Sequence, residues 1–132
     1  ETLASYELGK TVDWKGAVPF TEVRNFYATH DAFFFASLRD SSPAQLIEAM
    51  AFGLPVVTIN LHGQAMMISD ETGIRCACDT PEIAIAELKK AILYLYNHPE
   101  KVNEMSSAAY KHASQQNWTN KINKITHQFY NA

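Results

Sequence analysis

Two carboxylates flank the start of a predicted helix in the first half of the chain. Asp40 lies in a polar loop, and Glu48 lies in the second turn of the helix that follows it. Ser42 suits the N-cap of this helix, Pro43 its first position, and Gln45 completes the spacing of a capping box. The first-turn amides of such a helix carry a partial positive charge and spare N–H donors, which suit phosphate. The pattern therefore indicates an anion site in a chain whose formal net charge is -3.

Glu48 shares one face of the predicted helix with Ala44 and Ala51. A face lined by small side chains lets a flat ligand approach. The carboxylate can then accept hydrogen bonds from vicinal hydroxyls, as carboxylates do with ribose in other nucleotide folds. Residue types and spacing alone leave two alternatives open: Glu48 as a solvated helix residue, and Asp40 as a turn former.

Short apolar runs predict the strands that position this loop. Runs bounded by polar turns suit strands buried on both faces, and a shorter strand that ends at a glycine turn precedes them. The predicted strands are Lys10–Gly16, Ala32–Ala36, Leu54–Ile59 and Ile74–Cys78. Helical patterns alternate with the runs, which predicts an α/β domain with a parallel sheet flanked by helices. Ligands of such sheets bind beyond the carboxyl ends of the strands, where the Asp40 loop lies.

The predicted helices end at proline, glycine and capping signals. Thr21 is expected to cap the first helix, and Gly53 to close the second at a position that favours positive φ. The first three predicted helices are Thr21 to about His30, Pro43 to Gly53, and Ala65–Ser69. A long helix begins at Thr80-Pro81, with Ala84, Leu88, Ala91 and Leu95 on one stripe, and another follows Asn97-His98-Pro99 and runs through Val102, Met105 and Ala109. The last is Trp118–Tyr130, with Ile122, Ile125 and Phe129 on one side.

Composition excludes several classes of protein. A chain of 132 residues suits one domain, and 47% hydrophobic with 19% charged residues predicts a packed core rather than disorder. No Lys/Arg-rich patch occurs, so a nucleic-acid partner is not expected. No apolar run is long enough to span a bilayer, and no charged-then-apolar leader is visible. The sequence starts at Glu1 without an initiator Met, which leads us to expect a piece of a longer protein.

The cysteines predict neither a disulfide nor a metal site. Cys76 and Cys78 are too close in sequence for an unstrained disulfide on a strand. The five histidines form no ligand-spaced pair with each other or with the thiols. We interpret the two cysteines as small buried hydrophobes in a reducing compartment, which favours a cytoplasmic location.

A longer motif favours the binding roles of Asp40 and Glu48 over the alternatives of a turn former and a solvated helix residue. Residues 37–40 read Ser-Leu-Arg-Asp, and residues 46–57 read Leu-Ile-Glu-Ala-Met-Ala-Phe-Gly-Leu-Pro-Val-Val. This stretch resembles the nucleotide-sugar-binding domain of retaining glycosyltransferases with the GT-B fold, most closely those of family 4, also called group 1. That family carries a Glu, seven residues, then Glu-Ala-Met-Ala-x-Gly-x-Pro-Val-Val. Supporting matches in the same order are His30–Ser37, Lys15–Val18, His62-Gly63, Thr72-Gly73 and Trp118.

The resemblance implies a role for each matching residue. The second Glu of the family falls on Glu48, which implies bonds to the ribose hydroxyls, and the first falls on Asp40, which implies contact with the donor sugar. The glycine-rich stretch between them implies contacts of backbone amides with sugar and diphosphate. It falls on Ser41, Ser42, Pro43 and Ala44, and the turn at Gly16 to Val18 falls where the family approaches the base.

Four departures from the family pattern concern the same loops. Asp40 is one methylene shorter than the usual Glu, and Ser41-Ser42-Pro43 replaces Gly-Phe-Gly, so Pro43 removes one N–H donor. His62 stands where the first glycine of a Gly-Gly pair is usual, and Met66 where the family often has Glu.

The resemblance implies a partial C-terminal domain of a GT-B fold, with residues 1–132 as one donor-binding domain and the acceptor domain upstream and absent. It implies transfer of a sugar from a nucleotide-diphosphate donor to a glycan, lipid or small acceptor, as in polysaccharide biosynthesis, by a full-length parent that is membrane-peripheral or cytoplasmic. No metal or other cofactor is expected, and the isolated fragment is expected to be inactive. The alternative is a non-catalytic sugar-nucleotide-binding or interaction module, and truncation-exposed surface is expected to favour a homo-oligomer.

Overall fold

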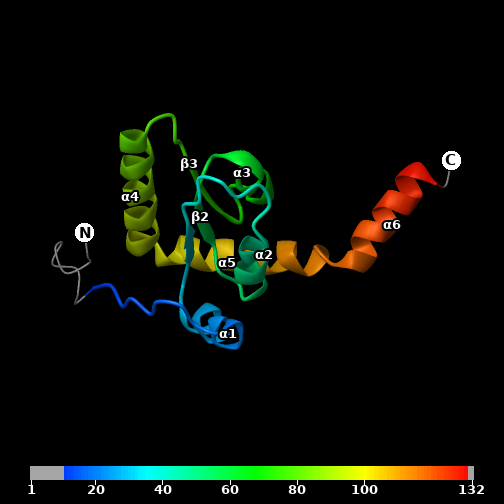
Figure 1. Cartoon of the computed structure of the whole chain (residues 1–132), viewed down its shortest axis with the longest axis horizontal. Coiled ribbons are helices and arrows are strands. Elements are labelled where there is room, and N and C mark those ends of the chain that lie inside the picture. The colour runs from blue at the N-terminus through cyan, green and yellow to red at the C-terminus, as the bar shows by residue number, and fades with distance from the viewer. Residues whose placement is uncertain (1–10, 131–132) are drawn as a thin grey trace.

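A computed structural model describes residues 11–130 of the chain (Figure 1). Within these residues, helices and strands alternate from the first helix to the fourth, and two further helices follow. The strands are β1 (Phe33–Phe35), β2 (Val56–Ile59) and β3 (Gly73–Cys76). The helices are α1 (Phe20–Thr29), α2 (Ala44–Ala51), α3 (His62–Met67), α4 (Pro81–Asn97), α5 (Pro99–Gln115) and α6 (Trp118–Phe129).

The three strands form one parallel sheet in the order β1-β2-β3. Phe33 pairs with Val56, and Val56 pairs with Gly73. Every residue of β2 is buried, because helices cover both faces of this central strand. The structure confirms the predicted α/β class, a parallel sheet flanked by helices.

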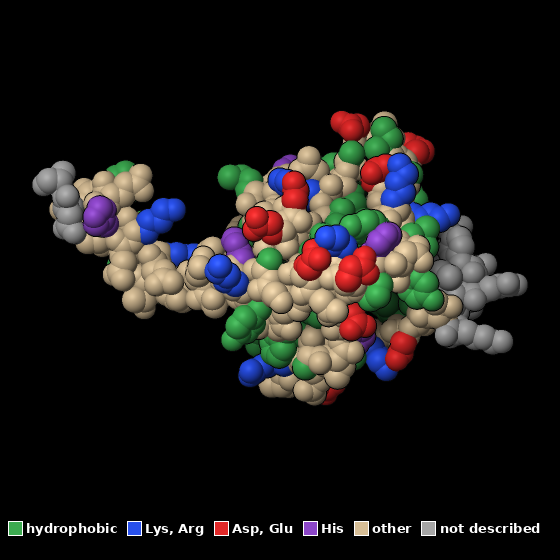
Figure 2. Space-filling model, turned by 180° about the vertical axis from the view of Figure 1, so that it is seen from behind, with side chains coloured by type: hydrophobic (Ala, Val, Ile, Leu, Met, Phe, Trp, Pro, Cys, Tyr) green, Lys and Arg blue, Asp and Glu red, His purple; other side chains and the backbone are tan. Residues whose placement is uncertain are grey.

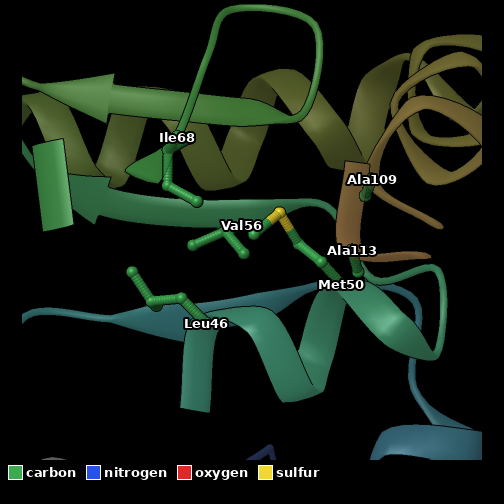
Figure 3. Packing of buried hydrophobic residues seen from close by; sticks show 6 residues of the cluster. All are labelled: Leu46, Met50, Val56, Ile68, Ala109 and Ala113. Carbon is green, nitrogen blue, oxygen red and sulfur yellow. The ribbon is translucent and has the colours of Figure 1, made fainter. Parts of the chain in front are cut away.

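Two apolar layers hold the helices on the sheet. On one face, side chains from α2, β2, α5 and the segment after α3 pack together (Figure 3). These residues are Leu46, Met50, Val56, Ile68, Ala109 and Ala113. On the other face α4 covers β2 and β3 through Val57, Cys76, Ala91 and Leu95. Burial of one leucine or methionine contributes about 1.5–3 kcal/mol, so each layer matters to a domain of this size.

Two predicted helix boundaries are confirmed by the hydrogen bonds. Gly53 has φ +77°, and its N–H donates to the Met50 carbonyl at 2.9 Å while Leu54 N–H donates to the Ala49 carbonyl at 3.1 Å. This pair of bonds is the Schellman motif, which a glycine allows at no steric cost. Thr80 caps α4 as predicted, since its hydroxyl accepts from Ile83 N–H.

Other predicted boundaries are wrong. Helix α1 begins at Phe20 with Pro19 before it, so Thr21 is not its cap. Helix α3 begins at His62, three residues earlier than the predicted Ala65. Residues 11–16 contain no strand, because Val12 and Trp14 are exposed and no described strand pairs with them; Lys10 lies outside the described residues.

Strand β1 is only partly buried, in contrast to the prediction for Ala32–Ala36. Phe34 is 47% exposed, because β1 is an edge strand of the described sheet and α4 covers β2 and β3 instead. The edge therefore presents an apolar side chain and unpaired backbone groups.

Helix α6 forms where the sequence predicts it but projects away from the rest of the fold (Figure 1). No residue of α6 is buried, so the stripe of Ile122, Ile125 and Phe129 does not cover the core of its own domain. None of the described helices is long and apolar enough to cross a membrane.

Candidate functional site

The Asp40 loop lies at the carboxyl end of β1 and leads directly into α2. The Asp40 Oδ1 atom accepts a hydrogen bond from Ser42 N–H at 3.1 Å. This local bond is an Asx turn, so Asp40 shapes the loop from within. The geometry matches the turn-forming alternative for Asp40 and leaves its predicted contact with a sugar as a prediction.

The start of α2 differs from the predicted capping box. Pro43 is the N-cap residue, and no side chain caps the helix, because Ser42 lies one residue too early for that position. Ser42 N–H is taken by Asp40, and proline has no N–H. The amides of Ala44 and Gln45 have no carbonyl four residues back within the helix. These two amides are therefore the donors that this helix start offers to an anion.

Helix α3 packs against the same loop from the side. A Cβ atom on Gly63 would lie 1.6 Å from the Ser41 carbonyl oxygen, so the backbones of the two segments touch. The Gln64 side chain is fully buried, and its Nε2 donates to the Ser37 carbonyl at 2.9 Å. The predicted Gly-Gly match located Gly63, whereas Gln64 carried no signal in the sequence because a polar side chain in a short helix is ordinarily exposed.

His62 adopts φ +53°, the left-handed region that favours glycine. The resemblance places a glycine of the family at this position, where this chain has a larger residue in a conformation that favours glycine. The observed strain therefore lies directly beside Gly63, where α3 meets the loop.

The Glu48 carboxylate is half-buried on the second turn of α2. Its Oε2 accepts a hydrogen bond from the Tyr27 hydroxyl of α1 at 3.4 Å. Burial raises the pKa of Tyr27, and the negative charge of Glu48 raises it further, so the phenol stays protonated as the donor. Glu48 is thus neither a freely solvated side chain nor an isolated one.

Tyr27 is a site residue that the sequence reading missed. Its ring lies edge-on to Phe33, with ring centroids 5.6 Å apart, and beside Phe52 at 5.7 Å. These contacts fix the ring, and the fixed ring holds the Glu48 side chain. Tyr27 falls within the predicted helix from Thr21 to about His30, and no spacing rule links it to position 48.

Gly16 and Val18 lie in the segment before α1, on the opposite side of the fold from the Asp40 loop (Figure 1). Gly16 has φ +64°, which confirms a turn. The start of the same segment, Thr11, lines a hollow of about 880 Å³ together with His30 and Asp31, which precede β1. The role of Gly16 and Val18 near a base stays a prediction.

A hollow of about 270 Å³ lies at the carboxyl ends of the strands, between the loop and α4. Leu38 of the loop, Ile59 at the end of β2 and Cys78 after β3 contribute to its lining. Ligand pockets usually measure about 300–1,000 Å³. The hollow is slightly smaller than this range, and Leu38 is the residue of the Asp40 loop that lines it.

Of the two cysteines that the sequence predicts to be buried, one is buried. Cys76 is buried in the α4 layer and Cys78 is half-buried, and both are free thiols. Burial raises the pKa of the Cys76 thiol, and Glu87 adds to the effect. Among residues 11–130, no three His, Cys, Asp or Glu side chains come together in a group that could hold a metal ion.

The fold is an α/β domain of the Rossmann-like class, in which α2 begins just after the carboxyl end of β1. Residues 1–112 match the family model of glycosyl transferases group 1. The chain therefore belongs to the group 1 glycosyltransferases, whose fold is of the GT-B type.

Two individual proteins are similar to the chain. An uncharacterized glycosyltransferase of Haemophilus influenzae is 30% identical over 105 residues, which cover 75% of this chain and 29% of that protein. The sucrose-phosphate synthase of Thermosynechococcus elongatus has a similar structure, with a TM-score of 0.79 at 20% identity, over 98% of this chain and 33% of that one. The second likeness supports the fold, a GT-B C-terminal Rossmann-like domain. The chain spans about a third or less of both proteins.

Proposed function

We propose that this chain is the donor-binding part of a retaining glycosyltransferase, which moves a sugar from a nucleotide-diphosphate sugar to a glycan, lipid or small acceptor. The observation that carries the proposal is the junction of the Asp40 loop with α2, in a chain of the group 1 family. The free amides of Ala44 and Gln45 lie at the carboxyl end of β1, where nucleotides bind to sheets of this class.

Each residue of the junction has a task in this proposal. Glu48, held by Tyr27, accepts hydrogen bonds from the ribose hydroxyls. Asp40 contacts the donor sugar, and the backbone of Ser41 to Ala44 contacts the sugar and diphosphate. As the glycosidic bond breaks, negative charge develops on the leaving diphosphate. Fixed N–H dipoles at the start of α2 stabilise that charge without rearranging. Gly16 and Val18 approach the base once the full domain is assembled.

The proposed transfer needs a second domain that binds the acceptor. We propose that residues 1–132 belong to one donor-binding domain and that an acceptor domain lies upstream in the parent protein. Support comes from the share of the Haemophilus protein that the chain matches, 29%, and from a hollow that is too small alone for a nucleotide sugar. On this proposal the fragment binds donor weakly and does not catalyse transfer.

The first prediction concerns Glu48. We expect Glu48→Ala to weaken binding of the preferred nucleoside diphosphate about ten- to a hundredfold, because a hydrogen bond to a charged group contributes about 1.5–3 kcal/mol. An NMR titration with UDP, GDP, ADP and dTDP measures the affinity of wild type and variant.

Glu71→Ala is the matched control, since it removes the same charge from an exposed turn before β3. It is expected to bind like wild type. Equal affinity of Glu48→Ala and wild type would remove Glu48 from the site, and a wild type that binds none of the four nucleotides would remove the proposal.

We propose that the reaction uses no bound metal and that the amides at the start of α2 offset part of the charge of the diphosphate. We expect the transfer rate of the full-length parent to stay within about twofold of its original value after EDTA treatment and desalting. A loss of activity that Mg²⁺ or Mn²⁺ restores would contradict this proposal.

A non-catalytic binding or interaction module is the second candidate function. The occupied Ser42 amide and the proline at position 43 favour it, since both reduce the number of donors that face a diphosphate. Turnover of donor sugars by the full-length parent separates the two functions, because a module binds nucleotide without releasing nucleoside diphosphate from its sugar.

Self-association through α6 is a further part of the proposal. Trp118, Ile122, Ile125 and Phe129 are all more than half exposed and follow a four-three-four spacing, as in paired helices. Figure 2 shows Lys and His side chains and no acidic side chain on the visible face of the projecting helix. The spacing and exposure of these four residues place an apolar stripe along one side of α6, and we propose that it packs against a second copy.

We expect the purified chain to scatter light as a dimer at high concentration. Placing a charge on the stripe with Ile122→Lys should give a monomer, whereas Asn123→Lys beside the stripe should not. A wild-type monomer at high concentration would contradict self-association.

The two cysteines bear on the compartment in which the protein works. The free thiols of Cys76 and Cys78 favour a reducing compartment, so we propose a cytoplasmic or membrane-peripheral enzyme. Transfer to a growing polysaccharide would suit that location.

A further inference from the structure

We propose that Gln64 is a positioning residue for the donor site: it holds the loop from Ser37 to Ser42 in the shape that leaves the amides of Ala44 and Gln45 open to a diphosphate. The inference rests on the proposed donor binding and adds a residue that acts on the site through the loop, without touching the ligand.

The contact joins two segments that are distant in sequence. Gln64 lies in the first half of α3, and its Nε2 donates to the carbonyl of Ser37, the second residue after β1, at 2.9 Å. The side chain has no exposed surface. Its reach is therefore fixed by packing, and the start of the loop cannot move away without leaving a buried amide unpaired.

The end of the loop is held by the neighbouring residue of α3. The Gly63 backbone lies against the Ser41 carbonyl, within the space of a single Cβ atom. Asp40 then ties Ser42 within the loop. The loop is thus held at Ser37 by a side chain and at Ser41 by backbone contact, both from α3, immediately before the helix start that binds the anion.

The energetics point to position rather than stability as the role of Gln64. The Gln64 Oε1 atom is buried and has no hydrogen-bond partner among the described residues. The same holds for Thr58 Oγ1 of β2, the strand against which α3 packs. A buried amide with one unpaired atom stabilises a core less than an apolar side chain of similar size. Among residues 11–130, the one side-chain hydrogen bond of Gln64 is the bond to the Ser37 carbonyl in the loop.

The test uses Gln64→Met, which keeps the volume and removes the donor. We expect its thermal midpoint to stay within a few degrees of wild type, because the variant also removes the unpaired oxygen. Exchange of the Ser42 amide, which is bonded to Asp40 Oδ1, should become faster, and affinity for the preferred nucleoside diphosphate should fall about tenfold. Gln64→Glu, which has no donor when ionised, should show the same two losses, and Gln128→Met on exposed α6 should show neither.

The outcomes separate this inference from the proposed function. If wild type binds no nucleoside diphosphate, donor binding itself fails, and faster loop exchange in both variants would still establish the clamp. If wild type binds and Gln64→Met binds equally well, or its loop amides exchange at the wild-type rate, the inference is overturned while donor binding stands. Unfolding of both variants would assign Gln64 to the core and overturn it as well.

Discussion

Replacing Gly63 by alanine is expected to destabilise the chain by at least about 3 kcal/mol and to abolish nucleotide binding. The added Cβ would lie 1.6 Å from the Ser41 carbonyl oxygen and 2.7 Å from its carbon. Both atoms belong to the backbone, so no change of rotamer relieves the clash. Either α3 leaves β2, which exposes Gln64, or the loop shifts and takes the start of α2 with it.

Urea unfolding followed by circular dichroism measures the loss, and a nucleotide titration of the folded fraction measures the effect on the site. Gly16→Ala is the matched control. Unlike Gly63, Gly16 has a positive φ, but its Cβ would meet only Trp14 Nε1 at 3.9 Å. The control should therefore cost only the strain of the left-handed conformation, about 1–2 kcal/mol. An unfolding midpoint for Gly63→Ala equal to that of wild type would contradict the contact between α3 and the loop.

The sequence predicted those parts of the fold that depend on local signals. The strand at Leu54–Ile59 is a run of apolar residues that only a buried strand satisfies, and β2 confirms it. Gly53 and Thr80 act through bonds to residues within four positions, so their roles at helix ends were visible in the spacing. The prediction that β1 is buried on both faces was wrong, because burial depends on which elements lie beside the strand. No local sequence pattern contains that information.

In the candidate site, too, the sequence indicated only the residues whose signals are local. Asp40 and Glu48 were found because they lie on either side of one helix start. Tyr27 and Gln64 were not, because each acts across the fold on a residue more than 20 positions away. The capping box failed for a local reason that spacing did not reveal: the Asp40 carboxylate competes for the Ser42 amide and shifts the helix start by one residue.

The second large effect is expected at Gly73, where β3 begins. A Cβ there would lie 2.0 Å from the Val56 carbonyl oxygen and 2.9 Å from the Val56 nitrogen. Val56 is the central residue of the pairing, with Phe33 on one side and Gly73 on the other. Gly73→Ala should separate β3 from β2, and the α4 layer, which packs Ala91 and Leu95 on Val57 and Cys76, would lose its support.

We expect Gly73→Ala to lose about 3 kcal/mol, a large part of the roughly 5–15 kcal/mol that stabilises a small domain, and to show a markedly lower thermal midpoint. Gly53→Ala provides the comparison, since Gly53 requires a positive φ but its Cβ would meet the Ser106 hydroxyl, a side chain that can rotate away. That variant should remain folded, with a loss of about 1–2 kcal/mol. A steeper loss for Gly53→Ala than for Gly73→Ala would mean that backbone conformation, rather than the space between β2 and β3, limits the stability of the sheet on which the donor loop rests.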